Sequence, residues 1–186
     1  MRNGIARRAA RTSASNDAQD SFRWFFLAEY PRVTRTAYHV VFDRTAAEDV
    51  AQEAFIQLAN HWSSVSQYDN PAAWVRRVAI RLAVREATRS RRRASTHLRA
   101  VSDAAVAAPT VNDPAERQPD PELVTAIRGL PPQQRAIVVM FYLEDRPMDE
   151  IADIVGCSRS TGWVHLHRAR SRLAELLGEE DSDDER

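Results

Sequence analysis

The chain has no lysine, a single cysteine, only five glycines and no long apolar run. One cysteine, Cys157, excludes an intramolecular disulfide, and its place in a predicted turn favours packing over redox sensing. No apolar stretch approaches the roughly 20 residues needed to cross a bilayer, and Arg7 and Arg8 are not followed by the apolar segment of a signal peptide. We therefore expect a cytoplasmic protein.

All 26 basic residues are arginines. This mainly reflects genome composition, although arginine also suits bidentate contacts with phosphate and guanine. His165 and His167 lie near Cys157 in the sequence, but no fourth ligand accompanies them, so we expect no metal site and no cofactor. The content of 44% apolar and 28% charged residues is ordinary for a soluble protein of one or two domains.

The net charge of zero hides a strong segregation along the chain. The charge is +2 over residues 1–20, +6 over 21–100, −3 over 101–120, zero over 121–178 and −5 over 179–186. A stretch rich in Ala, Pro, Asp and Ser, without an apolar period, indicates a flexible linker. We expect an all-α fold with a disordered basic tail (1–20), a four-helix domain (21–93), the linker (94–120), a helix-turn-helix domain (121–178) and an acidic tail (179–186).

A helix-turn-helix pattern lies between residues 147 and 172. The apolar face of its first helix ends at Gly156, which can take the left-handed conformation that ends a helix, and Ser158 or Ser160 can cap the next helix. That second helix buries a stripe that includes Gly162 and leaves a basic outer face, as expected of a DNA recognition helix. Its outward and flanking side chains are Arg159, Ser160, Trp163, Val164, His167 and Arg168. A helical hairpin with a merely solvated basic face is the alternative.

The first domain begins with apolar residues between Phe22 and Phe42, which predict two helices, with Pro31 placed where a helix can begin. Thr45 and Glu48 then form a capping box that opens a helix with a broad buried face. The exposed face of this helix is acidic and amide-rich and consists of Asp49, Gln52, Glu53 and Gln57. It is either simply solvated or a docking surface for a basic protein partner.

A further helix is predicted to start with Asn70 as its cap and Pro71 as its first residue. Arginines line one edge of its apolar stripe until Arg89 and Arg93 rotate into the stripe itself, so its last turns must extend past the core. Residues 76–93 hold eight arginines and one glutamate. Counterion release makes such a rod a strong phosphate ligand, and this favours nucleic acid over a solvated helix end.

Several short motifs follow one another in a characteristic order. They are Asp49–Phe55, Asn70–Ala79, Leu130–Arg135, Glu150–Ala152 with Gly156, and His167–Arg170. Together they resemble the extracytoplasmic-function sigma factors of bacterial RNA polymerase, in the sigma-70 family, over nearly the whole ordered chain. The resemblance implies a first domain that binds core polymerase and the minus-ten element and a second domain that binds the minus-thirty-five element.

The resemblance also implies roles for individual residues. Core polymerase would be bound by Asp49, Gln52 and Glu53. The minus-ten DNA would be bound by Trp74, Arg77, Arg81, Arg85 and Arg89. The minus-thirty-five DNA would be bound by Arg159, Ser160, Trp163, Val164, His167 and Arg168. The implied partners are the β′ clamp helices and β flap of polymerase, promoter DNA and an anti-sigma factor, with no small-molecule substrate.

The chain departs from the family pattern at Arg81 and Arg85, where many members have Asn and Asp, and at Gly162-Trp163 in the recognition helix. The resemblance to the family therefore does not predict which promoter sequence this chain recognises. A stand-alone helix-turn-helix regulator of operator DNA is the alternative function. A nuclease or recombinase is disfavoured, because the carboxylates of Asp49 and Glu53 have no supporting His or Lys. On the sigma-factor interpretation the polymerase, and not this chain, is the enzyme.

Overall fold

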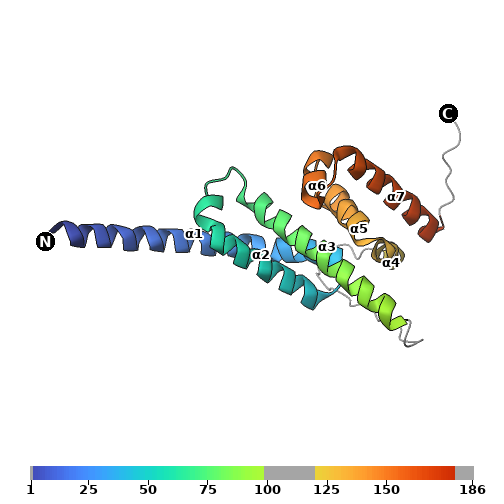
Figure 1. Cartoon of the computed structure of the whole chain (residues 1–186), viewed down its shortest axis with the longest axis horizontal. Helices are drawn as coiled ribbons and strands as arrows, with labels where there is room; N and C mark the ends of the chain where they lie inside the picture. Colours follow the sequence, from blue (N-terminus) through green and yellow to red (C-terminus); the bar gives the residue numbers. More distant parts are fainter. Residues whose placement is uncertain (1, 99–119, 179–186) are drawn as a thin grey trace.

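The computed structural model describes residues 2–98 and 120–178, with side chains described for 18–94 and 120–178, and within these ranges it contains helices and no strand. Three long helices come first: α1 (Arg2–Val41), α2 (Arg44–Val65) and α3 (Pro71–Leu98). A second group contains α4 (Pro121–Gly129), α5 (Pro132–Val138), the π-helix η1 (Val139–Leu143), α6 (Met148–Val155) and α7 (Arg159–Leu177). The predicted all-α fold with two helical domains is confirmed (Figure 1).

Helix α1 corrects two expectations. It is one continuous helix with Pro31 inside it, not two helices, so the first domain has three long helices in place of the four expected. It also begins at Arg2, so the segment expected to be a disordered tail is helical. The helix is continuous because its core-facing stripe keeps the same helical spacing before and after Pro31. The stripe consists of Phe22, Phe26, Tyr30, Val33, Ala37 and Val40.

An aromatic cluster holds α1 against α2. Phe26 meets Phe55 edge-on with ring centroids 4.9 Å apart, and Phe22 meets Trp62 in the same way at 5.3 Å. The Trp62 indole N–H also donates to the Ala18 carbonyl at 3.2 Å, which satisfies the polar end of a partly buried ring. Helix α3 packs across both helices (Figure 1), and this fixes the orientation of its arginines.

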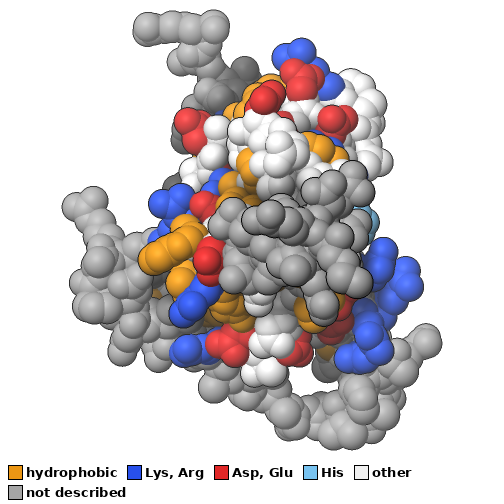
Figure 2. Space-filling view, turned by 90° about the vertical axis from the view of Figure 1, so that its left-hand side faces the viewer, with side chains coloured by type: hydrophobic (Ala, Val, Ile, Leu, Met, Phe, Trp, Pro, Cys, Tyr) orange, Lys and Arg blue, Asp and Glu red, His pale blue; other side chains and the backbone are white. Residues whose placement is uncertain are grey.

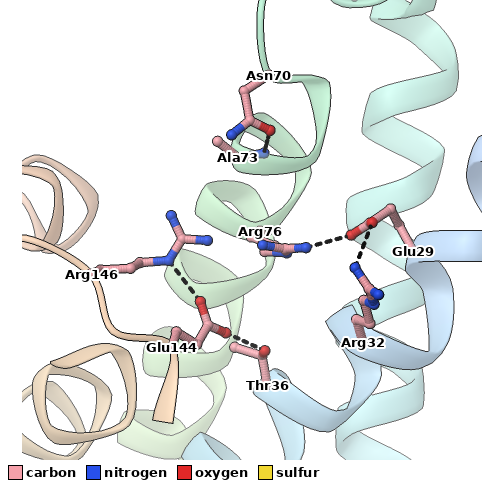
Figure 3. Close-up of polar contacts among 8 residues, drawn as sticks. All are labelled: Glu29, Arg32, Thr36, Asn70, Ala73, Arg76, Glu144 and Arg146. Carbon is pink, nitrogen blue, oxygen red and sulfur yellow. Dashed lines mark hydrogen bonds and ion pairs between the residues drawn. The ribbon is translucent and has the colours of Figure 1, made fainter. Parts of the chain in front are cut away.

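The helix starts are set by short polar side chains. The predicted cap of α3 is confirmed, because the Asn70 side-chain oxygen accepts a hydrogen bond from the Ala73 amide at 3.0 Å (Figure 3). The predicted Thr45–Glu48 capping box is wrong. Asp43 caps α2 two residues earlier, since its extended backbone lets its carboxylate accept from the Ala46 amide at 2.8 Å.

The second domain is built around the α6–α7 turn. Gly156 ends α6 with φ 75° and ψ 44°, as predicted, and Ser158 caps α7 by accepting from the Thr161 amide at 3.1 Å. Gly162 is buried where the two helices meet, and a Cβ added to it would lie 2.7 Å from the sulfur of Met148. The absence of a side chain at this position therefore sets how closely α7 approaches α6.

Arg135 of α5 is the central buried polar group of the second domain, with only 7% of its surface exposed. Its guanidinium donates to the carbonyls of Ile127, Arg128 and Leu130, and so ties α4 to α5. Burial, together with nearby Arg91 and Arg128, lowers the pKa of Arg135 to about 10, so the side chain is still charged at neutral pH.

The two domains lie against each other in the structure (Figure 1). Helices α5 and α6 contact α3, while α5 and η1 contact α1. The predicted linker lies mostly outside the described residues, although its first residues, 94–98, continue α3.

Candidate polymerase and nucleic-acid interfaces

The acidic face of α2 is exposed as a continuous strip. Asp49, Gln52 and Glu53 all face solvent, while the opposite side of the helix is buried in the core of the first domain. Within this strip the Gln57 side-chain amide donates from Nε2 to Glu53 Oε1 at 2.9 Å. Ile56, which is 57% exposed, extends the strip by one turn. The sequence analysis missed this residue, although its spacing from Gln52 and Glu53 places it on the same face.

The arginine edge of α3 is divided between several neighbours. Arg85 and Arg89 are exposed, and the Arg89 guanidinium lies 4.0 Å from the carboxylate of Glu86 on the same helix. Arg77 is half-buried, and the Trp74 ring lies 5.8 Å from the His61 ring. Most of the edge is thus accessible to a polyanion, as expected for the turns that extend past the core.

Arg81 differs from the other arginines of this edge. Its guanidinium donates to the backbone carbonyl of Ile154 and to that of Asp153, each at 2.9 Å, at the end of α6 in the second domain. Sequence patterns could not reveal this contact, because it joins positions more than 70 residues apart. A residue predicted to bind DNA thus already uses part of its guanidinium within the protein, although the residue is exposed.

Arg76, which lies beside the predicted arginine edge, pairs with Glu29 of α1 at 2.7 Å, and both side chains are largely buried (Figure 3). The same carboxylate lies 3.5 Å from Arg32. This arginine holds α3 against α1. Figure 2 shows the side of the molecule that lies at the left of Figure 1, where acidic side chains are scattered among hydrophobic ones and basic side chains lie at both the left and the right edge.

The outer face of α7 carries the whole predicted recognition set. Arg159, Ser160, Trp163, Val164, His167 and Arg168 are all exposed, whereas Gly162, Leu166 and Ala169 are buried. Arg159 lies 3.3 Å from the carboxylate of Asp149 on α6, and the Ser160 hydroxyl lies 2.9 Å from that of Ser158. The helix thus presents one polar and aromatic face away from the core, which is the geometry of a helix that enters a DNA groove.

Both halves of the chain match the sigma-70 family. Residues 25–93 match sigma-70 region 2, and residues 121–173 match sigma-70 region 4. The chain is also 30% identical to the RNA polymerase sigma factor CarQ of Myxococcus xanthus, over 87% of its own length and 92% of that protein. The chain belongs to the extracytoplasmic-function sigma factors of the sigma-70 family.

Other comparisons agree with this assignment. The sigma factor is 31% identical to the RNA polymerase sigma-E factor of Streptomyces avermitilis, over 87% of this chain and 88% of that one. Its fold is similar to the sigma factor RpoE of Bartonella quintana, solved in complex with the anti-sigma factor NepR. The TM-score is 0.66 at 23% identity, over 85% of this chain and 97% of that chain.

Family membership establishes the general function. The sigma factor binds core RNA polymerase and directs promoter recognition, DNA melting and transcription initiation. Sigma factors are regulatory subunits without catalytic activity of their own. No helix within the described residues is long and apolar enough to cross a membrane, and in the same part of the chain no three side chains of the metal-binding types cluster together.

Trp163 of the sigma factor is partly held by its own domain. Its ring meets that of Phe141 in the π-helix edge-on, with centroids 5.6 Å apart, and Phe141 in turn meets Tyr142 at 5.0 Å. Trp163 remains 44% exposed, so one side of the ring is packed and the other is accessible. The sequence analysis missed Phe141 and Tyr142. Their apolar character was visible, but the π-helical turn that aims Phe141 at α7 was not.

Proposed function

We propose that this sigma factor divides its activity among three exposed faces: α2 binds polymerase, α3 binds the minus-ten element, and α7 binds the minus-thirty-five element. The observation that carries the proposal is that each face is polar or charged on one side of a helix whose other side is buried. Each helix is thus held by the core while its outer side chains remain available. Because the polymerase performs nucleotide transfer, this chain needs no catalytic group.

The polymerase-binding face would consist of Asp49, Gln52, Glu53 and Ile56. The two carboxylates would attract a basic surface on the clamp helices, and Gln52 and Ile56 would add hydrogen bonding and apolar contact. The accessibility of all four side chains supports this role. Rim charges act mainly on the association rate, so Asp49 should matter most at low salt.

The matched test of this face replaces Asp49 and Gln52 together by alanine and compares the variant with Glu175→Ala on exposed α7. We expect the double variant to lose affinity for core polymerase by at least tenfold, since each buried interfacial polar contact contributes about 1 kcal/mol or more. Glu175→Ala should bind as the wild type does. Wild-type affinity in the double variant would contradict the docking assignment.

The minus-ten face would combine Arg77, Arg85 and Arg89 as phosphate ligands with Trp74 as a stacking surface for an unpaired base. Arg81 would join them once it is released from α6. Binding to single-stranded DNA should weaken as salt rises. Arg85→Gln should reduce the slope of log K against log salt by about 0.7, the value for one phosphate contact on a single strand. Arg44→Gln, an exposed arginine of α2, is the control.

The minus-thirty-five face would place Arg159 and Arg168 near phosphates and Trp163 near base edges. An indole cannot make the bidentate contact with guanine that arginine makes, so Trp163 would contact a thymine methyl group or sugar. Replacing Trp163 by alanine should relax base preference at one or two positions. Arg168→Gln should weaken binding to all sequences about equally.

A run-off assay with purified core polymerase tests the function as a whole. The sigma factor should confer promoter-dependent initiation on core polymerase, and transcript starts mapped after overexpression would define both promoter elements. A stand-alone regulator would instead bind duplex DNA without polymerase and would not need Asp49 or Gln52. Absence of promoter-dependent initiation would refute the proposal.

We also propose that an anti-sigma protein restrains this chain in the cytoplasm, where its polymerase is. The support is the fold similarity to the Bartonella quintana sigma factor that was solved with such a partner. Co-purification of the tagged sigma factor from its native cells, followed by mass spectrometry, should recover one small partner besides polymerase subunits.

A further inference from the structure

Besides apolar packing, the joint between the two domains contains side chains that bind backbone carbonyls of the other domain. Arg81 of α3 donates to Asp153 and Ile154 at the end of α6, both at 2.9 Å. The last carbonyls of a helix lack partners within it and carry the negative end of the helix dipole, so a guanidinium stabilises them. This contact crosses from the first domain to the second.

A second arginine makes the reciprocal contact. Arg135 of α5 donates to the carbonyl of Val40 at 2.6 Å, near the end of α1, and its guanidinium lies 5.2 Å from the centre of the Phe42 ring. Each domain thus supplies one arginine that binds carbonyls near the end of a helix in the other domain. The contact between the domains depends on two specific side chains as well as on apolar packing.

A third contact involves the segment between η1 and α6. The Thr36 hydroxyl of α1 donates to the carboxylate of Glu144, and Arg146 binds the other oxygen of that carboxylate at 2.7 Å (Figure 3). Thr36 is buried, and the side chains of Glu144 and Arg146 are mostly covered. The Thr36 hydroxyl therefore binds a carboxylate of the second domain whose orientation is fixed by Arg146.

The joint combines polar contacts with a shared apolar core and is incompletely filled. A cavity of about 350 Å³ lies between α1, α3 and η1, and its lining includes Arg32, Arg76 and Glu144. Interfaces between domains of one chain commonly mix polar and apolar contacts in this way, and such domains commonly move relative to each other. The contacts can therefore be specific without being permanent.

We propose that these contacts form a latch that closes the second domain over α3 in the free sigma factor and that the latch competes with promoter DNA for Arg81. This inference rests on the proposed minus-ten role of α3. In the closed state the Nε and one terminal nitrogen of the Arg81 guanidinium donate to α6 carbonyls, so these two nitrogens are not available for a bidentate contact with phosphate. Binding of the minus-ten strand and opening of the joint are therefore coupled, and each favours the other.

Weakening the latch should change the affinity for DNA in one direction only. When only an open fraction of the molecules can bind DNA, the apparent dissociation constant equals the intrinsic one divided by that fraction. A variant that weakens the latch without touching α3 should therefore bind single-stranded DNA more tightly. A static pair of domains, or one already open, would show no such gain.

Thr36→Val is the informative variant, because valine has nearly the shape of threonine but cannot donate to Glu144. Loss of a hydrogen bond to a charged group should shift the closed–open equilibrium about tenfold. Thr34→Val is its matched control on the same helix, since the Thr34 hydroxyl donates to the Tyr30 carbonyl of α1 itself at 2.9 Å. Arg81→Met removes the α3–α6 contact directly.

The closed state is measured without DNA. Spin labels on cysteines at Ala59 of α2 and Glu175 of α7, both exposed, report the distance between domains in the full chain with Cys157→Ser. Wild type and Thr34→Val should give one narrow distribution. Thr36→Val combined with Arg81→Met should give a broad distribution shifted to longer distances. A broad distribution in the wild type, or a narrow one in the double variant, would overturn the latch.

The competition is measured by anisotropy of a fluorescein-labelled, mixed-sequence single-stranded oligonucleotide. Thr36→Val should bind it up to about tenfold more tightly than wild type does, Thr34→Val should bind as wild type, and Arg85→Gln should bind more weakly while its joint stays closed. Opening without tighter binding would refute the competition. If no variant binds the oligonucleotide, the minus-ten role fails together with the competition, while the distance distributions still decide whether the latch exists.

Discussion

Replacing Arg135 by lysine should destabilise the sigma factor strongly, although the charge is conserved. The guanidinium uses three nitrogens to reach four carbonyls, those of Val40, Ile127, Arg128 and Leu130. A lysine has three N–H donors on a single nitrogen, so at least one of these carbonyls loses its donor. We expect two to lose it, because one nitrogen does not span the distance that the three nitrogens of the guanidinium cover. At about 1.5 kcal/mol for each hydrogen bond from a charged group, the free energy of unfolding should fall by about 3 kcal/mol.

The burial of the charge does not offset this loss, because lysine carries the same charge into the same site. For a chain of this size, about 3 kcal/mol corresponds to a lower Tm by roughly 6–12 °C. Urea denaturation followed by circular dichroism gives the free energy directly. Arg170→Lys, at an exposed position of α7, is the control and should be within about 0.5 kcal/mol of wild type.

The pH dependence of the Arg135→Lys variant provides a second check. Burial and the neighbouring Arg91 and Arg128 that lower the pKa of Arg135 should lower the pKa of the lysine as well. The unfolded chain then binds the proton more readily than the folded one. The stability of the variant should therefore rise with pH above about pH 8, towards the ordinary lysine pKa of about 10.4. A variant as stable as wild type at neutral pH would refute the assigned hydrogen bonds.

Three further predictions concern other parts of the fold. Gly162→Ala should lower the free energy of unfolding by about 1 kcal/mol, because strain against Met148 outweighs the gain in helix propensity. Met148→Ala should lower the free energy of unfolding less in the Gly162→Ala background than in the wild type. Asn70→Ala should cost about 1 kcal/mol in urea denaturation, through loss of the cap on the Ala73 amide; no loss would show that the cap is dispensable. Cys157 should react with iodoacetamide at mildly alkaline pH more slowly than free cysteine does, since burial raises the pKa of its thiol; an equal rate would contradict that burial.

Local signals in the sequence predicted the helix starts and stops that depend on neighbouring residues. Gly156 and Asn70 act where their residue types predict, because a left-handed turn and a side-chain cap are decided within a few residues. Pro31 was misinterpreted for the opposite reason. A proline can start a helix, but here packing of the residues on both sides of it against α2 and α3 keeps α1 continuous.

The exposure of the candidate site residues could be predicted from the sequence, but the side chains and carbonyls that they contact in the fold could not. The outer faces of α2 and α7 follow from helical periodicity, and the residues predicted on them are exposed except Gln57, which is partly buried. The engagement of Arg81 by α6 and of Arg135 by α1 depends on how two domains meet, and no periodicity within one segment encodes that. Phe141 was missed because a π-helical turn changes which way a side chain points without changing the composition.

The contact between Trp163 and Phe141 has a consequence for the evolution of promoter choice. One side chain both helps to hold α7 in place and faces outward where bases would be read. If Trp163 contacts bases as proposed, a mutation there would change stability and base preference together. A change of base preference would then require a compensating change at Phe141 or its neighbours. Lineages that carry this aromatic pair should alter the minus-thirty-five sequence more slowly than the rest of the promoter.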